Sequence, residues 1–216
     1  MSCAICETRK EKRFCPAVHG KICPQCCGTE REVTLDCPSE CPYLQQARKN
    51  ESAKYAREIE REALFPQVEV PDSFLYEREP LLAGLSYALA KAARSDRAVY
   101  DRDIIQALTA MAKTYETLAN SGLHYESPTA NPIQHAIAAE VQKMIEEYRK
   151  TEEQHRGFTT LKTSDTLRAL VFLLRLALGR TSGRPKSRAF VDFLLAQFPE
   201  QSAAPGAEQG SRIIVP

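Results

Sequence analysis

Residues 3–41 read CAICETRKEKRFCPAVHGKICPQCCGTEREVTLDCPSEC, and this stretch contains all eight cysteines of the 216-residue chain. Most of the cysteines form close pairs, with two or three residues between the thiols. The eight are Cys3, Cys6, Cys15, Cys23, Cys26, Cys27, Cys37 and Cys41. Such pairs are typical of chains that chelate a tetrahedral metal ion. The sequence therefore predicts a cysteine-rich metal module over residues 1–45.

The ligand pairing within this module stays open at the level of sequence. One arrangement interleaves two four-thiolate sites, with Cys3, Cys6, Cys23 and Cys26 in the first and Cys15, Cys27, Cys37 and Cys41 in the second. Another arrangement uses His19, which follows Cys15 by four residues, and leaves Cys26 or Cys27 without a metal. Either way the sites are complete in protein ligands, so we expect a structural metal rather than a catalytic one.

We expect the metal to be zinc, as two structural ions. A module of this length buries too little apolar surface to fold unaided, and structural zinc supplies the missing free energy. The competing interpretations are an iron–sulfur cluster, which also needs four thiolates, and a redox switch with Cys26 and Cys27 as the sensitive pair. Disulfides are disfavoured, because the N-terminus lacks the apolar segment of a secretory signal and we expect a cytoplasmic, reducing environment.

The rest of the chain predicts helices almost throughout. Residues 46–80 combine a polar helix with a proline-containing linker, and residues 68–70 fit one short strand. Residues 81–199 carry apolar stripes at helical spacing, which indicate about five helices, with the segment 164–178 as the most buried and Pro185 as a start for the last. Residues 200–216 have the composition of a flexible tail. The predicted fold class is mainly α, a small zinc module followed by an all-α helical bundle.

The cysteine pattern resembles the cross-braced zinc fingers of the MYND and HIT types, which begin with Cys-x2-Cys and close with a ligand pair at x3 spacing. The chain departs from them at Cys37, where those fingers usually place a histidine, and at Cys15, where they have a second tight cysteine pair. The resemblance covers residues 3–41 and implies two zinc ions and a protein-binding finger. Residues 22–31 and 183–194 are also similar to segments of bacterial proteins of unassigned activity.

Charge and motifs narrow the function further. The formal net charge is +1, which points to neither nucleic acid nor a membrane surface. One basic loop, with Arg180, Arg184, Lys186 and Arg188, is a candidate for binding phosphate or a nucleic-acid backbone. The sequence contains no glycine-rich phosphate loop and no nucleophile elbow, so it gives no basis for naming a reaction. We expect a non-enzymatic adaptor that binds a protein partner, with nucleic-acid binding and redox sensing as the alternatives.

Overall fold

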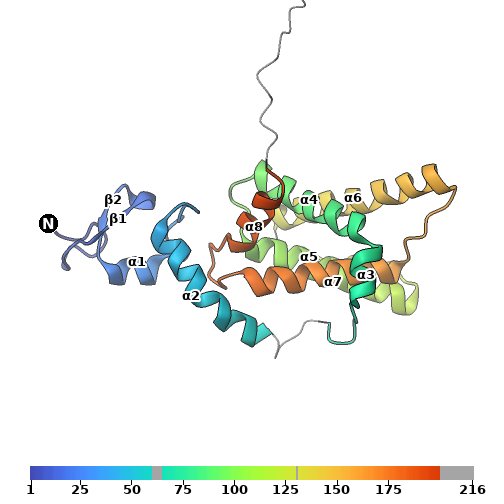
Figure 1. Ribbon diagram of the computed structural model, residues 1–216, viewed down its shortest axis with the longest axis horizontal. Helices are drawn as coiled ribbons and strands as arrows, with labels where there is room; N and C mark the ends of the chain where they lie inside the picture. Colours follow the sequence, from blue (N-terminus) through green and yellow to red (C-terminus); the bar gives the residue numbers. More distant parts are fainter. Residues whose placement is uncertain (60–64, 130, 200–216) are drawn as a thin grey trace, which may run out of the picture.

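The structure, a computed structural model, describes residues 1–59, 65–129 and 131–199 (Figure 1). Within these residues the chain forms eight α-helices and one two-stranded sheet, so the predicted fold class, mainly α behind an N-terminal cysteine cluster, is confirmed. Figure 1 shows the cysteine module at one end of the molecule and the longer helices at the other. The predicted tail, residues 200–216, lies outside the described residues.

The cysteine module is built around a small hairpin and a short helix. Strands β1 (Arg13–Cys15) and β2 (Gly20–Ile22) pair antiparallel, with a 3₁₀ turn over Pro16–Val18 between them. Helix α1 (Pro24–Glu30) follows directly, because Cys23 is its N-cap residue and Pro24 occupies the first turn, where the missing N–H costs nothing. The sequence did not predict the hairpin, whose strands are only three residues long.

Helix α2 (Pro42–Ile59) begins immediately after Cys41 and connects the module to the body. It packs against α7 (Thr163–Arg180), the helix that the sequence predicts to be most buried. Leu44 and Ala47 on α2 are buried, although the helix is polar over most of its length. The connection is therefore a packed helix over its first turns.

The body comprises α7 and five further helices, α3 (Asp72–Glu77), α4 (Glu79–Ser95), α5 (Asp101–Ser121), α6 (Pro132–Arg156) and α8 (Ala189–Gln197). Helix α7 packs on α2, α5, α4 and α8, while α4 and α6 pack together on the other side. The predicted apolar stripes form its core, in which Leu85, Leu108 and Leu170 are fully buried. None of the described helices is long and apolar enough to cross a membrane.

Two helix ends have residue types that are favoured at such positions. Asn131 caps α6 by accepting a hydrogen bond from the Gln134 amide at 2.9 Å, and Gly122 ends α5 with a φ of 72°. The Gln134 side chain is buried and donates a hydrogen bond to the Gln106 side chain on α5.

Two expectations for the secondary structure are wrong. No strand forms at residues 68–70, because Arg175 of α7 donates to the Phe65 and Val68 carbonyls at 2.8 and 2.9 Å and thereby fixes this segment as a loop. Helix α8 starts at Ala189 rather than near Pro185. The fully buried Asp101 carboxylate accepts the Phe190 and Val191 N–H groups, which are the free donors of a first helical turn.

A buried carboxylate organises the end of the body formed by α3, α4, α6 and α7. Glu152 on α6 accepts hydrogen bonds from the Thr160 amide and hydroxyl, both at 2.8 Å, and from the Thr159 hydroxyl at 2.9 Å. Arg78 joins Glu152 to Asp165, at 3.4 and 2.9 Å. Burial acts to raise the pKa of Glu152, but the hydrogen bonds from Thr160 and Thr159 outweigh it and lower this pKa below its ordinary value.

We predict that Glu152→Gln lowers the free energy of unfolding by about 2 kcal/mol at neutral pH, because several donors lose a charged acceptor. A carboxylate with a lowered folded-state pKa stabilises the protein above its unfolded pKa, and this contribution is lost as the pH falls through the folded value. Denaturant unfolding should therefore show a gap between wild type and variant that narrows in acid. The exposed neighbour Glu153→Gln is the control; a gap that is constant with pH would contradict the prediction.

Candidate metal centre

Four cysteine sulfurs meet at one point of the module. The thiols of Cys3, Cys6, Cys23 and Cys26 all lie within 4.8 Å of one another, and Cys3, Cys23 and Cys26 are buried. Four sulfurs around a tetrahedral ion with metal–sulfur bonds of about 2.3 Å are about 3.8 Å apart, so the observed group fits one ion with little movement. All eight cysteines are free thiols in the structure.

Local backbone geometry brings these thiols together. The sulfur of Cys3 accepts the Cys23 amide at 3.1 Å, and the sulfur of Cys23, at the N-cap of α1, accepts the Cys26 amide at 3.4 Å. The first turn of α1 therefore presents two sulfurs on one side, and the N-terminal turn supplies the other two. Amide donors directed at sulfur also stabilise the thiolate form, which is the form that binds a metal.

The electrostatics of the cluster favour negative sulfurs on two of the four ligands. Hydrogen bonds from the Thr8 side chain and from the Arg9 and Thr8 backbone lower the pKa of Cys6 to about 5. The Cys26 amide lowers the pKa of Cys23, whereas burial, followed by its hydrogen bond with Cys23, raises the pKa of Cys26 to about 12. The Arg9 guanidinium lies 4.0 Å from the Cys26 sulfur and provides a positive charge beside the cluster.

The other four cysteines surround a second, small cavity. Cys15 from β1, Cys27 from α1, and Cys37 and Cys41 from the segment before α2 all line it, together with apolar side chains such as Ile22 and Leu44. Burial raises the pKa of Cys37, while the Glu32 backbone N–H donates to its sulfur and acts to lower it. Within the described residues, the sulfurs of Cys3, Cys6, Cys23 and Cys26 are the only group of potential metal ligands that all lie within 4.8 Å of one another.

His19, the alternative ligand, lies apart from the four-sulfur cluster. It is an exposed residue in the left-handed conformation, with a φ of 48°, at the end of the turn that joins β1 to β2. The structure brings together the first four cysteines of the interleaved arrangement, Cys26 among them, whereas Cys27 lies with Cys15, Cys37 and Cys41 around the second cavity.

The predicted basic loop lies against the metal module. Arg184 donates to the Gly28 and Arg31 carbonyls at 2.9 and 2.7 Å and so satisfies backbone acceptors at the C-terminal end of α1. Lys186 donates to the Asp36 carboxylate and to the Thr34 carbonyl, both at 2.9 Å. These two cations therefore join the body to the module.

The remaining two loop cations make contacts within the body. Arg188 donates to the Arg97 and Val99 carbonyls at 2.6 and 2.7 Å, between α4 and α5. The Arg180 guanidinium lies 3.7 Å from the centroid of the Phe193 ring, as a cation–π pair. All four predicted anion-binding residues therefore have partners inside the chain.

At the centre of this contact lies Glu32, which sequence reasoning missed. Its side chain is almost fully buried, and its carboxylate accepts from Arg48 of α2 at 2.8 Å and from the Ser182 hydroxyl at 2.7 Å. Arg48 also bonds Asp192 of α8, at 2.6 Å. No local pattern marks Glu32, because Ser182 lies 150 residues away in the sequence.

We predict that Glu32→Gln lowers the free energy of unfolding by about 3 kcal/mol, because it leaves the partly buried Arg48 guanidinium without one of its two carboxylates. Hydrogen exchange at residues 181–188 should accelerate at the same time, since Ser182 loses its charged acceptor. Denaturant unfolding of the metal-loaded protein measures the first effect. The exposed Glu7→Gln, in the same module, should change stability by less than about 0.5 kcal/mol; equal effects of the two variants would show that Glu32 does not hold the module.

The chain was also compared with known proteins. No protein-family model, no curated protein and no solved structure matches it. The candidate function therefore rests on the geometry of the chain's own residues, and that geometry is a four-cysteine metal cluster in a module that is bonded to a helical body.

Proposed function

We propose that this chain is a cytoplasmic zinc-binding interaction protein, in which two structural zinc ions fold the N-terminal module into a recognition surface for a protein partner. The observation that carries the proposal is the meeting of four thiols, from Cys3, Cys6, Cys23 and Cys26, within 4.8 Å. Four soft donors at tetrahedral spacing suit zinc, and they leave no position for a water or a substrate. A single ion also fits this spacing better than an iron–sulfur cluster, whose irons would push the sulfurs further apart.

A second zinc ion is supported by the cavity that Cys15, Cys27, Cys37 and Cys41 line. Its donors come from the hairpin, from α1 and from the segment that leads into α2, so one ion there would connect all parts of the module. Cys37 is also bonded to the Glu32 backbone, beside the contact between module and body. The second ion would therefore hold the module in its docked position.

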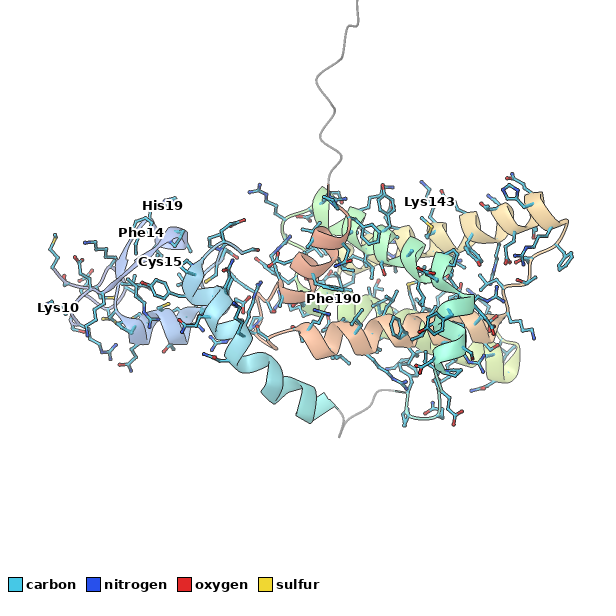
Figure 2. The ribbon with its side chains drawn as sticks, in the orientation of Figure 1. Lys10, Phe14, Cys15, His19, Lys143 and Phe190 are labelled. Atoms are coloured by element: carbon cyan, nitrogen blue, oxygen red, sulfur yellow. The ribbon has the colours of Figure 1, made fainter. Side chains whose placement is uncertain are left out.

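The recognition surface that we propose is the outer face of the hairpin. Phe14 of β1 has 58% of its surface exposed (Figure 2), and Val18, in the turn between β1 and β2, is also exposed. The body contacts the module through Glu32 and the α1 carbonyls, and Phe14 is exposed outside these contacts. An exposed aromatic side chain on a rigid metal-bound hairpin is a suitable anchor for a protein interface.

Native mass spectrometry tests the metal assignment. We expect two zinc ions in the wild-type protein, and one in each of the single variants Cys23→Ser and Cys37→Ser, because each removes a ligand from a different site. A double variant should hold none. One zinc in the wild type that survives Cys37→Ser would overturn the second site, and bound iron would overturn the choice of metal.

Capture of partners by crosslinking tests the recognition surface. Phe14→Ser should lose the proteins that wild type captures while still binding two zinc ions, because Phe14 is exposed and supplies no metal ligand. Phe158→Ser is the matched control, since Phe158 is comparably exposed, at 62%, but lies after α6 in the body. Equal recovery by all three proteins would show that the hairpin is not the binding face.

Nucleic-acid binding is the second candidate, and one observation favours it. Arg94, Arg97 and Arg188 line a shallow hollow beside α8, and guanidinium groups are suited to phosphate oxygens. The proposal predicts affinity for RNA or DNA that falls steeply with salt. The double variant Arg94→Ala with Arg97→Ala should weaken this binding; weak binding that is insensitive to salt would dispose of the candidate.

A further inference from the structure

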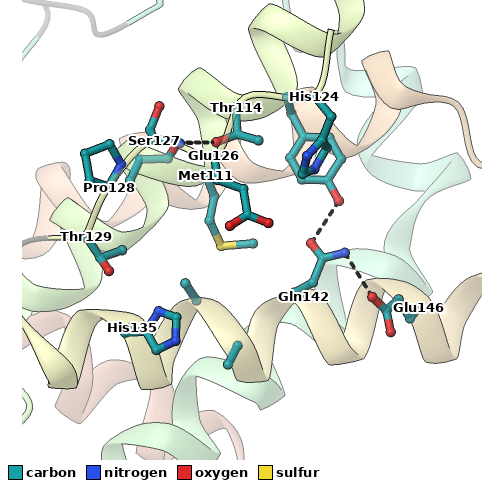
Figure 3. A pocket seen from close by; sticks show the side chains of 14 residues that line it. Met111, Thr114, His124, Glu126, Ser127, Pro128, Thr129, His135, Gln142 and Glu146 are labelled. Carbon is teal, nitrogen blue, oxygen red and sulfur yellow. Dashed lines mark hydrogen bonds between the residues drawn. The ribbon is translucent and has the colours of Figure 1, made fainter. Parts of the chain in front are cut away.

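A cavity of about 570 Å³ lies between α5, α6 and the segment that joins them, remote in sequence from the cysteines (Figure 3). This volume falls within the range that small-molecule sites occupy in proteins. Figure 3 shows His135 and Gln142 on α6 at one side, and Met111 and Thr114 on α5 at the other. The connecting segment, with Glu126, forms the third wall.

The cavity lies between two hydrogen-bonded bridges that join the side chains of α5 and α6 at different positions along the helices. At one level Gln134 bonds Gln106, and at the other the Tyr115 hydroxyl donates to Gln142 at 3.0 Å. Between these bridges the two helices present alanines to each other, Ala110 on α5 and Ala138 and Ala139 on α6. Methyl groups cannot fill the space that the longer bridging side chains hold open.

The connecting segment is fixed over this space rather than packed into it. The Ser127 amide donates to the Thr114 hydroxyl at 3.0 Å, which ties the segment to α5 halfway along the cavity. Gly122 ends α5 with a positive φ and so turns the chain back along the helix. The third wall is consequently held in place while the cavity stays open to solvent.

The charges that line the cavity are negative. Glu126 and Glu146 contribute carboxylates, and no lysine or arginine is among the lining residues. Glu146 accepts from Gln142 at 3.2 Å, whereas the Glu126 carboxylate points into the cavity towards Met111 (Figure 3). The apolar part of the lining comprises the alanines, Pro128, the Met111 thioether and the Tyr115 ring.

We propose that this cavity binds a small organic cation, an ammonium group on a compact apolar body, with the ammonium at Glu126 and the apolar body against Met111 and Ala139. A carboxylate and an electron-rich ring and thioether attract a positive charge, and the alanine floor accommodates a ring or short chain. The proposal uses none of the residues that carry the proposed metal function, so either can fail without the other.

Three probes of about nine heavy atoms with the same phenyl body test the inference: phenethylamine, 2-phenylethanol and phenylacetate. Their affinities for the full chain are measured by ligand-observed NMR at mildly alkaline pH, where free imidazole is uncharged and the amine stays protonated. We expect millimolar binding of phenethylamine, which suits a fragment of this size, weaker binding of the alcohol, and none of the acid. Equal binding of amine and alcohol, or no binding of the amine, would overturn the proposal.

Two variants separate charge from volume. Glu126→Gln should weaken phenethylamine binding about tenfold and leave 2-phenylethanol unchanged, because it removes one charge-assisted bond. Ala139→Leu should weaken both probes, because it fills the floor without changing any charge. Glu153→Gln, an exposed carboxylate on α6 outside the cavity, is the control. If Glu153→Gln weakens the amine as much as Glu126→Gln does, the attraction comes from the general surface charge and the assignment of Glu126 is wrong.

Discussion

The attraction of four thiolates to one cation is the constraint on which the N-terminal part of this structure depends. The module has a hairpin with strands of three residues each, one short helix and few buried apolar side chains, so its hydrophobic free energy is small. Its cysteines, however, are spaced so that the N-terminal turn and the first turn of α1 present their sulfurs to the same point. Amide donors at these sulfurs and the Arg9 guanidinium nearby reduce the repulsion that four such ligands would otherwise experience.

The helical body also holds the cysteine module in place. Its loop between α7 and α8 satisfies carbonyls of α1 through Arg184, and its Ser182 and the α2 residue Arg48 share the buried carboxylate of Glu32. Burying these charged groups costs free energy, and this cost is offset because each group has hydrogen-bonding partners within ordinary bonding distance. The module and the body are therefore joined by a specific set of polar contacts, which favour one orientation.

Which features of the structure can be predicted from the sequence depends on how far apart in the sequence the interacting residues lie. The apolar stripes of α4 to α7, the Asn131 cap and the Gly122 terminus are local signals, and all were predictable. The grouping of the cysteines was one of two arrangements that their spacing allows. The docking of the basic loop was not predictable, because Glu32 and Ser182 meet across 150 residues. The cavity beside Glu126 depends on alanines of two helices facing each other, which no single stretch of sequence reveals.

The Glu32 carboxylate links the stability of the last helix to that of the cysteine module. Arg48, which it neutralises, also bonds Asp192 on the last helix, so the charge balance of α8 depends on the module remaining in place. An ion that binds only the folded module stabilises everything that requires that fold, by mass action. The melting behaviour of α8, at the opposite end of the sequence from the cysteines, should therefore report the concentration of free metal.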